Sequence, residues 1–502
     1  MIPLLSPEES RALDRHAIDG LGVPGVVLME NAGAGAYRAL VERFGGKLSS
    51  PVIFGGPGNN GGDAWVVARH LENAGIATVP VLVGERGQVS GDARVNLAAL
   101  EAIRGGVHEG EVDYSSLCSA ATVIVDGLFG TGLDRDLGGA FAAAVRAINA
   151  SDAPVLALDI PTGVHGGSGA VLGSAVRADV TTTFAAHKLG LHQHPGVALA
   201  GQVLLVSIGV PAPESATAML LERADVARAV PMRAVGAHKG RAGRVWVCAG
   251  SPGKVGAALL AGRGALRAGA GLVTLAPRGE VARALVGAIP ELMVEALPQN
   301  VQRAVELLTE SCDAAVVGPG FGLDGAAMAV ALGIARGLPV PTVLDADALT
   351  ALAGSPDLSL ARAPAPRVLT PHAGEAARLL GTTSAQVQAD RYGAARRLAA
   401  ATGATVVLKG ARTLIASADG DLRVCPFGTP ALATAGTGDV LAGAIGAFLG
   451  AGLSPVEAAS STVVVHALGG EATARGDRGL LASEVADALP KALEHCRKTL
   501  PS

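Results

Sequence analysis

Ala433-Thr-Ala-Gly-Thr-Gly-Asp439-Val-Leu-Ala-Gly443 is a glycine-rich turn that runs directly into a long apolar segment. Gly436 and Gly438 allow the backbone to turn with its N–H groups pointing inward. The apolar run 440–453 predicts a buried helix whose N-terminus carries partial positive charge, so the turn is a suitable place for a phosphate. Asp439, at the start of this helix, is either a simple helix cap or a base that takes a proton from a substrate hydroxyl beside the anion.

Further motifs follow strand-like runs upstream of this turn, and they favour the catalytic interpretation. They are Gly318-Pro-Gly-Phe-Gly322, Asp345-Ala-Asp347, Thr370-Pro-His372 and Lys409-Gly-Ala-Arg-Thr413. Two of them have structural alternatives: an aspartate can cap the next helix while Asp347 braces its loop, and an isolated histidine is most often a structural hydrogen-bonder. The chain has no Walker A sequence, which argues against a P-loop enzyme.

This ordered set resembles the ribokinase-like superfamily, in which a Gly-Thr-Gly-Asp turn forms an anion hole and its Asp is the catalytic base. The resemblance covers roughly the second half of the chain. It implies a ribokinase-like α/β domain and phosphoryl-transfer chemistry.

Length and composition indicate two α/β domains. A chain of 502 residues is too long for one ordinary core, and 69 glycines with only 3% aromatic residues suit helices that lie close on sheets. The net charge of -4 argues against nucleic acid as a partner. Five cysteines without a CxxC spacing indicate neither a zinc site nor a disulfide framework. With no leader or membrane span evident, we expect a cytoplasmic homo-oligomer without nucleic-acid or membrane partners.

The first half begins with a capping box at Ser6–Glu9 and continues into a βαβ unit. A strand at 51–54 ends in Gly55-Gly-Pro-Gly-Asn-Asn-Gly-Gly-Asp63, and a helix and a strand at 78–83 follow. The loop matches the pattern G-x-G-x-x-G, and Glu85 follows it at about the sequence separation of the acidic residue that binds the ribose in dinucleotide folds. A dinucleotide site is therefore one possible interpretation of this loop. Its side-chain oxygens better suit a hydroxyl-bearing ligand or a hard cation. The alternative is an Asx-rich turn that caps the helix.

Later strands of this half end in similar polar loops. The strand at 121–125 leads into Asp126-Gly-Leu-Phe-Gly130-Thr-Gly-Leu133, and the strand at 155–158 leads into Asp159-Ile-Pro-Thr162-Gly163. In a doubly wound sheet these strand ends can converge on one edge. Together with Asn-Asn-Gly-Gly-Asp, these motifs resemble the NAD(P)H-hydrate epimerase domain over about residues 1–215, which implies a Rossmann-like fold.

This resemblance implies a substrate site, a potassium site and a catalytic acid/base, Asp159. The expected substrate contacts are Asn59, Asn60, Gly61, Gly62, Asp63, Gly130, Thr131, Gly132, Leu133, Asp134, Arg135, Asp136 and Asp159. The expected potassium ligands are Asn60, Asp126 and Thr162. Lys188 either neutralises a phosphate or developing charge, or is simply solvated. His192 and His194 lack a nearby third ligand, so we interpret them as surface or loop histidines rather than a metal site.

The second half resembles the NAD(P)H-hydrate dehydratase within the ribokinase-like superfamily. The resemblance rests on the motifs above and on His238-Lys-Gly and Gly269-Ala-Gly-Leu-Val273. It implies hydrate contacts at Ala258, Gly322, His372 and Asp439, with Asp439 as the catalytic base. It implies that the adenine nucleotide, with Mg²⁺, lies against Lys409, Gly410, Ala411, Arg412, Thr413 and Gly438. Gly253-Lys-Val-Gly256, just before Ala258, departs from the commoner family pattern.

Together the halves resemble the bifunctional NAD(P)H-hydrate repair enzyme family. We expect an epimerase domain at 1–222, a linker within 209–235, and a dehydratase domain at 223–502 that uses ADP, because the fusion resembles bacterial members. The expected function is epimerisation of R and S hydrates of NADH or NADPH, followed by nucleotide-dependent dehydration of the S form. The alternatives are a hydroxymethylpyrimidine- or pyridoxal-type kinase fused to a nucleotide-binding module, and a NAD-dependent oxidoreductase.

Overall fold

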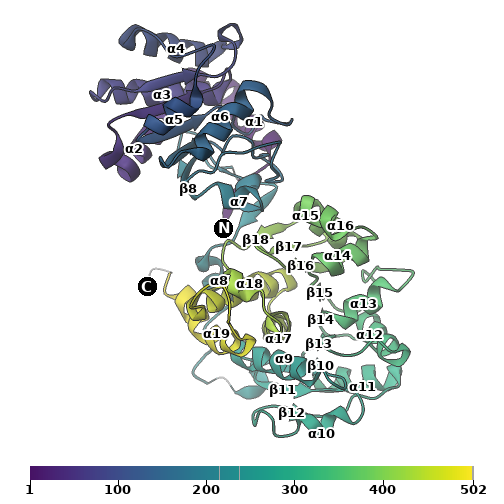
Figure 1. Ribbon diagram of the computed structural model, residues 1–502. Coiled ribbons are helices and arrows are strands. Elements are labelled where there is room, and N and C mark those ends of the chain that lie inside the picture. Colours follow the sequence, from purple (N-terminus) through teal and green to yellow (C-terminus); the bar gives the residue numbers. More distant parts are fainter. Residues whose placement is uncertain (214, 237, 500–502) are drawn as a thin grey trace. The chain divides into compact units, whose positions relative to one another are not determined.

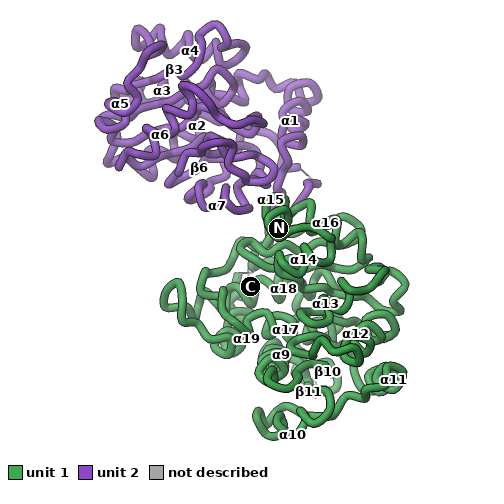
Figure 2. The backbone as a smooth tube through the Cα atoms, turned by 45° about the vertical axis from the view of Figure 1, so that its right-hand side comes forward, with its two compact units in different colours: residues 1, 219–502 green, residues 2–218 purple. Residues whose placement is uncertain are grey.

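The computed structural model describes residues 1–213, 215–236 and 238–499, and the chain divides into two compact units (Figures 1 and 2). The N-terminal unit contains residues 2–218, and the C-terminal unit contains residues 219–502 together with Met1. Each unit is an α/β structure, which confirms the predicted fold class. Among the described residues, no helix has both the length and the apolar character needed to cross a membrane.

The N-terminal unit is built on a six-stranded parallel sheet. In spatial order its strands are β3 (Val79–Leu82), β2 (Pro51–Gly55), β4 (Val123–Gly127), β5 (Val155–Leu158), β6 (Val180–Phe184) and β8 (Gln202–Val206). A separate parallel pair joins β1 (Ile2–Leu5) to β7 (His187–Lys188). The winding reverses between β2 and β4, because β3 lies on one side of β2 and β4 lies on the other. A crevice for a ligand forms at such a reversal.

Helices surround this sheet. They are α1 (Pro7–Arg15), η1 (His16–Gly20), α2 (Gly25–Phe44), η2 (Gly45–Lys47), α3 (Asn59–Asn73), η3 (Arg86–Gln88), α4 (Gly91–Arg104), α5 (Tyr114–Ala120), α6 (Gly139–Ala150), η4 (Leu189–His192) and α7 (Gly196–Leu199). The predicted capping box starts α1: Glu9 N donates to Ser6 Oγ at 3.2 Å, and Ser6 N donates to Glu9 Oε2 at 2.7 Å.

The C-terminal unit has a longer, mostly parallel sheet. Its strands, in spatial order, are β12 (Met293–Val294), β11 (Leu272–Leu275), β10 (Arg244–Cys248), β13 (Ala314–Val317), β14 (Thr342–Leu344), β15 (Arg367–Leu369), β16 (Thr405–Leu408), β17 (Leu414–Ala416), β18 (Leu422–Val424) and β9 (Ala218–Leu220). Neighbouring strands from β12 to β16 are parallel, and the two pairings made by β17 are antiparallel.

Two groups of helices flank this sheet, as Figure 1 shows. One group comprises α8 (Arg223–Ala229), α9 (Val255–Ala268), α17 (Thr437–Gly450), α18 (Pro455–Thr473) and α19 (Ala482–Arg497). The other comprises α11 (Val301–Ser311), α12 (Gly325–Gly337), α13 (Asp347–Ala353), α14 (Ala373–Leu380), α15 (Ser384–Ala389) and α16 (Arg391–Thr402). The remaining short helices are η5 (Lys239–Ala242), α10 (Val281–Leu285) and η6 (Pro430–Leu432).

The prediction of a linker is wrong for the second part of that segment. Residues 218–229 form β9 and α8, which belong almost wholly to the C-terminal unit. β9 pairs with β18 through Leu220 and Val424, and the buried side chain of Val226 anchors α8 in the apolar core. The segment is ordered because its partners are supplied by residues about 200 positions further along the chain.

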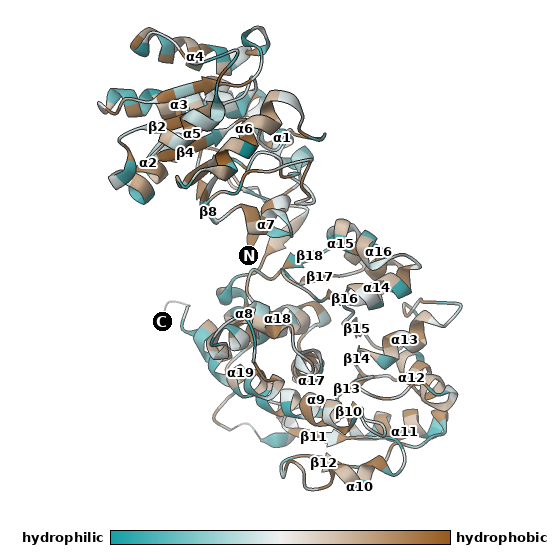
Figure 3. Ribbon diagram, viewed as in Figure 1, coloured by the Kyte–Doolittle hydropathy of each residue, from teal (hydrophilic) through white to brown (hydrophobic). Residues whose placement is uncertain are grey.

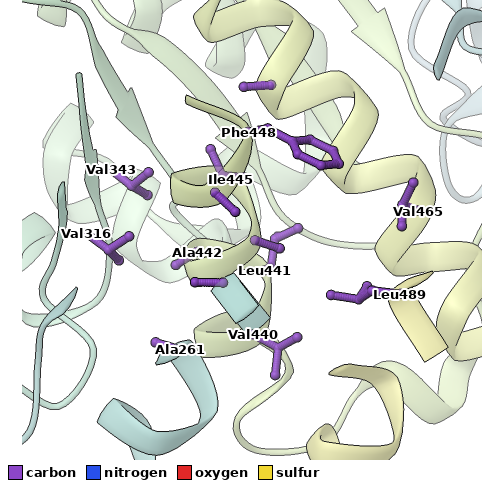
Figure 4. Packing of buried hydrophobic residues seen from close by; sticks show 14 of the residues in the cluster. Ala261, Val316, Val343, Val440, Leu441, Ala442, Ile445, Phe448, Val465 and Leu489 are labelled. Atoms are coloured by element: carbon purple, nitrogen blue, oxygen red, sulfur yellow. The ribbon is translucent and has the colours of Figure 1, made fainter. Parts of the chain in front are cut away.

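The core of the C-terminal unit is centred on α17, the apolar helix predicted after the Gly-Thr-Gly-Asp turn. Figure 4 shows its side chains between Val316 and Val343 of the sheet and Val465 and Leu489 of α18 and α19. The hydropathy colouring of Figure 3 places hydrophilic residues on outer helices such as α4 and α19. The helix that carries the predicted phosphate turn is therefore held by the packed interior rather than by a surface loop.

Candidate active sites

The N-terminal unit contains a cavity of about 520 Å³ beside the crevice between β2 and β4. Of the predicted substrate residues, Asn59, Asn60, Asp63, Asp159 and the run Gly130–Leu133 line it. Lys188 lines it as well. Gly61 and Gly62 are buried next to it but do not line it, and the predicted contacts 134–136 are exposed outside the lining. The structure therefore gathers most, but not all, of the predicted substrate residues.

Close backbone packing explains the glycines that shape this cavity. A Cβ added to Gly61 would lie 1.9 Å from the carbonyl oxygen of Gly56, and one added to Gly56 would lie 2.0 Å from that of Leu128. A Cβ on Gly130 would meet Asp159 Oδ2 at 2.8 Å and Asn60 Cγ at 3.5 Å. The glycines therefore let the turn at the start of α3 approach the loop after β4, and they leave room for the polar side chains.

Asp159 forms a buried ion pair with Lys188. Lys188 Nζ lies 2.7 Å from Asp159 Oδ1 and also donates to the carbonyl of Phe184 at 2.7 Å. The amide of Thr131 donates to Asp159 Oδ2 at 3.1 Å. Lys188 is only 4% exposed, so its interpretation as a solvated lysine is wrong. Asp159 also has a φ of 64°, a conformation that costs energy in a residue with a Cβ and that is typical of functional sites.

The three predicted potassium ligands lie in the buried interior of this unit. Thr162 Oγ1 donates to Asp126 Oδ1 at 2.7 Å, and Thr162 N donates to Asp126 Oδ2 at 2.8 Å. Burial nevertheless raises the pKa of Asp126 to about 6. In the described part of the chain, neither polar atom of the buried Asn60 amide has a hydrogen-bond partner. A carboxylate, a hydroxyl and an unsatisfied amide oxygen are hard oxygen donors, so these residues fit a hard cation.

The two histidines at 192 and 194 have different surroundings. His194 is exposed as predicted, but His192 is buried, and its Nε2 lies 3.0 Å from Nδ1 of His187. Burial lowers the pKa of His187 to about 4. Across the described residues, no group of three or more His, Cys, Asp or Glu side chains could hold a metal ion. The prediction that His192 lies at the surface is therefore wrong, because His192 and His187 form a buried hydrogen-bonded pair.

In the C-terminal unit, the predicted motifs follow the carboxyl ends of neighbouring parallel strands. The Gly318 turn follows β13, Asp345 follows β14, His372 follows β15 and Lys409 follows β16. Because the carboxyl ends of parallel strands share one edge, residues separated by up to about a hundred positions in the chain come together. The turn that starts α17 adds Asp439 to this group, as its electrostatic interactions with Asp345 and Lys409 indicate.

Lys409 is held by carboxylates at this edge. Its Nζ lies 2.9 Å from Asp345 Oδ1 and 3.9 Å from Glu375 Oε2. Thr370 Oγ1 also donates to Asp345 Oδ1, at 2.7 Å. Burial acts to lower the pKa of Lys409, but Asp345 and Glu375 outweigh it and raise that pKa above its usual value. Lys409 therefore stays a cation next to the glycine turn, where a Cβ added to Gly438 would lie 3.4 Å from Nζ.

The Asp439 side chain does not cap α17. The N-cap residue of α17 is Gly436, with a φ of 90°, and the Asp439 carboxyl accepts no hydrogen bond from any described residue. Burial raises the pKa of Asp439 to about 7, and the negative charges of Asp345 and Asp347 add to this effect, while Lys409 opposes it. A carboxyl with this pKa is matched to proton transfer near neutral pH.

His466 of α18 supports the same turn and was missed by the sequence analysis. Its Nε2 lies 3.0 Å from the carbonyl oxygen of Thr437, and Thr437 Oγ1 donates to the carbonyls of Leu432 and Thr434 at 3.0 Å each. Burial lowers the pKa of His466 to about 4, so its neutral ring is the donor in this bond. A single histidine within a helix that is otherwise apolar was the signal that could have identified it.

The remaining predicted hydrate contacts differ in their exposure to solvent and in their hydrogen bonds. His372 caps α14: its Nδ1 accepts from Gly374 N at 3.0 Å, while its ring is largely exposed. Asp347 braces Gly322, whose amide donates to Asp347 Oδ2 at 2.9 Å. His372 is therefore a helix cap and Asp347 braces its loop, as the structural alternatives predicted, and the exposed ring of His372 remains accessible to a ligand. Ala258 is fully buried in α9, beneath Gly250.

The predicted nucleotide residues after Lys409 form the turn between β16 and β17. Gly410 has a φ of 142°, and a Cβ there would lie 3.0 Å from the guanidinium of Arg391. Arg412 has a φ of 57° and donates from Nη1 to the carbonyl of Pro426 at 2.7 Å. Thr413 Oγ1 donates to the carbonyl of Gly410 at 2.9 Å. Arg391, another residue that the sequence analysis missed, donates to the Leu408 carbonyl at 3.2 Å and so holds the strand end just before this turn.

Two family models match the two halves of the chain. The model described as YjeF-related protein N-terminus matches residues 25–190, and the model described as NAD(P)H-hydrate dehydratase matches residues 245–491. Among solved structures, the chain is similar to a Bacillus subtilis ADP/ATP-dependent NAD(P)H-hydrate dehydratase co-crystallised with ATP/Mg²⁺, with 30% identity and a TM-score of 0.50 over 56% of this chain and 99% of that one. It is also similar to a ribokinase-like superfamily protein from Enterococcus faecalis, with 29% identity and a TM-score of 0.50 over 57% of this chain and 98% of that one.

The similarity to curated relatives extends over both units. A Thermofilum pendens protein named bifunctional NAD(P)H-hydrate repair enzyme is 40% identical, and the match covers 98% of this chain and 97% of that protein. The family models, the ribokinase-like structural similarity and this nearly full-length match agree with each other and with the motifs. The chain therefore belongs to the family of bifunctional NAD(P)H-hydrate repair enzymes.

Proposed function

We propose that this chain repairs hydrated NADH and NADPH with two active sites. The N-terminal domain, 1–222, interconverts the R and S epimers at C6 of the hydrated nicotinamide ring. The C-terminal domain, 223–502, dehydrates the S epimer at the expense of ADP. The observation that carries the proposal is the presence in one chain of two Lys–Asp ion pairs, Lys188–Asp159 and Lys409–Asp345, whose aspartates follow the parallel strands β5 and β14.

In the N-terminal site, Asp159 is the proposed acid/base. Loss of the C6 hydroxyl leaves a ring cation that water can re-enter from either face, and a carboxylate held by Lys188 and the Thr131 amide can exchange protons with that water. Asn60, Asp126 and Thr162 would hold the potassium ion. The ion would supply positive charge that orders this loop region and offsets the burial of the Asp126 carboxylate.

In the C-terminal site, Asp439 orients the C6 hydroxyl and accepts its proton as the phosphoryl group is transferred. The amides of Gly436–Gly438 and the Lys409 ammonium hold the phosphates, because helix N-termini and cations stabilise the charge of the transferred group. Magnesium would accompany the nucleotide, as in the solved relative. Phosphate is a better leaving group than hydroxide. The ring nitrogen can therefore expel it, and loss of a C5 proton restores the dihydronicotinamide without a stable phosphorylated product.

The cytoplasmic location and the homo-oligomeric state of the chain stay predictions. The five cysteines are free and buried, which is compatible with the reducing cytoplasm that we propose as the compartment. The proposed homo-oligomer is tested by light scattering of the purified full chain.

A single assay tests the two activities. The full chain is incubated with racemic hydrate and with ADP or ATP in parallel, and recovery of the reduced-nicotinamide absorbance is followed. We expect complete recovery with wild type, and recovery of only the S half with Asp159→Asn. If Asp159→Asn abolishes both activities, the assignment of two independent sites is wrong. If the chain instead forms a stable phosphate ester of hydroxymethylpyrimidine or pyridoxal, it is a vitamin kinase.

A further inference from the structure

The cavity of the N-terminal unit contains a second buried carboxyl whose catalytic role the proposed function leaves open. Asp63, on α3, lines the cavity together with Asp159 and is 8% exposed. No donor in the described part of the chain bonds to its carboxyl. The carboxyl lines the cavity, so it is available to a molecule that binds there.

The two carboxyls are in opposite environments. Asp159 has a cation at 2.7 Å and an amide donor at 3.1 Å. Asp63 has neither, and burial, followed by the negative charges of Asp159 and Asp14, raises the pKa of Asp63 well above its usual range, with Lys188 only partly opposing. The charged groups that line the cavity are Arg11, Asp14, Asp63, Asp92, Asp159 and Lys188. Two carboxyls with such different environments take the roles of acid and base.

Epimerisation at C6 requires both roles. A hydroxyl must leave one face of the ring with an added proton, and a water must enter the other face and lose one. Each proton transfer needs a group within about 3 Å of the oxygen. A carboxyl on each face of the ring satisfies this condition for both proton transfers while the ring keeps one orientation.

We propose that Asp63 is the acid that protonates the departing C6 hydroxyl while Asp159 is the base that deprotonates the water entering the opposite face. This inference rests on the proposed epimerase function. Asp63 gives its proton to the hydroxyl, the C6–O bond breaks, water leaves, and the lone pair of the ring nitrogen forms the C6=N bond of the cation. Water then forms a new C6–O bond on the other face as its proton passes to Asp159, and the electron pair returns to nitrogen.

After one turnover the proton has moved from Asp63 to Asp159. The site is then arranged for the opposite epimer, for which Asp159 is the acid and Asp63 is the base. Conversion of R to S therefore prepares the site for conversion of S to R, and return of the proton through cavity water resets it. Both carboxyls are consequently needed in both directions.

The experiment uses the full chain with purified R hydrate and no nucleotide, so that the C-terminal site is idle, and separates the epimers by chromatography. We expect Asp63→Asn to lower kcat in both directions by about 100-fold or more with little change in KM. Asp63→Glu should recover part of the rate, because it restores the proton. Asp19→Asn is the matched control, since Asp19 is exposed on the adjacent η1 and does not line the cavity. It should leave both kcat and KM unchanged.

The pH profile of the wild-type chain gives a second reading that does not depend on any variant's folding. Because Asp63 must be protonated for R-to-S turnover, kcat/KM should fall on the alkaline side, and Asp63→Asn should lack this fall. A wild-type rate that stays constant into the alkaline range, or an Asp63→Asn rate equal to wild type, overturns the inference while leaving the epimerase function standing. A wild-type chain that does not epimerise the hydrate would instead refute the proposed function itself.

Discussion

At the scale of single residues, Asp439 is the group whose loss should be most damaging to dehydration. Asp439→Asn keeps the size of the side chain and removes the base, and loss of a general base typically lowers a rate by roughly 10²- to 10⁴-fold. We expect kcat for dehydration of the S hydrate to fall at least about 100-fold, with nucleotide affinity near wild type. Single-turnover kinetics and calorimetric titration with ADP measure the two quantities separately. Near-normal dehydration would mean that another residue is the base, with His372 the next candidate.

The pKa of Asp439 predicts how dehydration responds to pH. Burial, with Asp345 and Asp347, raises this pKa to about 7, and the base must be ionised to accept a proton. The kcat/KM for dehydration should therefore rise as pH increases through about 7. Asp345→Asn removes a neighbouring negative charge and should move the inflection to lower pH. Asp477→Asn, on an exposed carboxylate that pairs with Arg478, is the control and should not move it. An unchanged inflection in Asp345→Asn would contradict the assignment.

At the scale of secondary-structure elements, the crossing of α9 and α17 places the phosphate turn. A Cβ on Gly443 would lie 1.9 Å from the carbonyl oxygen of Ala261, and a Cβ on Gly264 would lie 2.3 Å from that of Val440. Each helix therefore presents a glycine to the backbone of the other. Neither contact can be relieved by turning a side chain, since both involve backbone atoms.

Gly443→Ala should consequently destabilise the C-terminal unit by about 1–3 kcal/mol, the usual cost of overpacking. Urea unfolding of the full chain, followed by the fluorescence of Trp246 in a Trp65→Phe background, reports on this unit, because these are the only two tryptophans. Gly476→Ala is the matched control, since nothing lies within 4 Å of its added Cβ. A stability of Gly443→Ala equal to that of the control would show that the two helices can shift apart freely.

At the scale of the whole molecule, each unit has its own candidate site, so the two activities should be separable. Asp159→Asn alone should stop after the S half of a racemic hydrate, and Asp439→Asn alone should dehydrate almost none. A mixture of these two full-length variants should convert all of it, because the S hydrate can diffuse from one chain to another. Absorbance recovery measures all three, with Asp159→Asn giving the background rate of spontaneous epimerisation. A mixture that stops at the S half would show that the epimers pass only between sites of one chain.

Local sequence patterns were sufficient for much of the fold. The strand at 155–158 has the predicted bounds, and the strand expected at 51–54 extends by one residue to Gly55, because each is a short apolar run ended by polar or glycine residues. The segment 218–229 was interpreted as linker because its strand and helix depend on pairing with β18 and on burial of Val226. The bounds of a helix or strand can be predicted from the sequence where its own residues determine them. They are missed where pairing or packing with a distant segment determines them.

For the sites, the sequence by itself determined which residue types stand at the strand ends and therefore which chemistry belongs there. Only the tertiary structure decided that Lys188 is a buried partner of Asp159, that His192 bonds to His187, and that no described residue donates to the Asp63 carboxyl. It also decided that burial and the charge of Asp345 raise the pKa of Asp439 to about 7. The physical reason is that motifs record the donors and acceptors a reaction needs, while burial and neighbouring charges, which set protonation states, come from residues far apart in the chain.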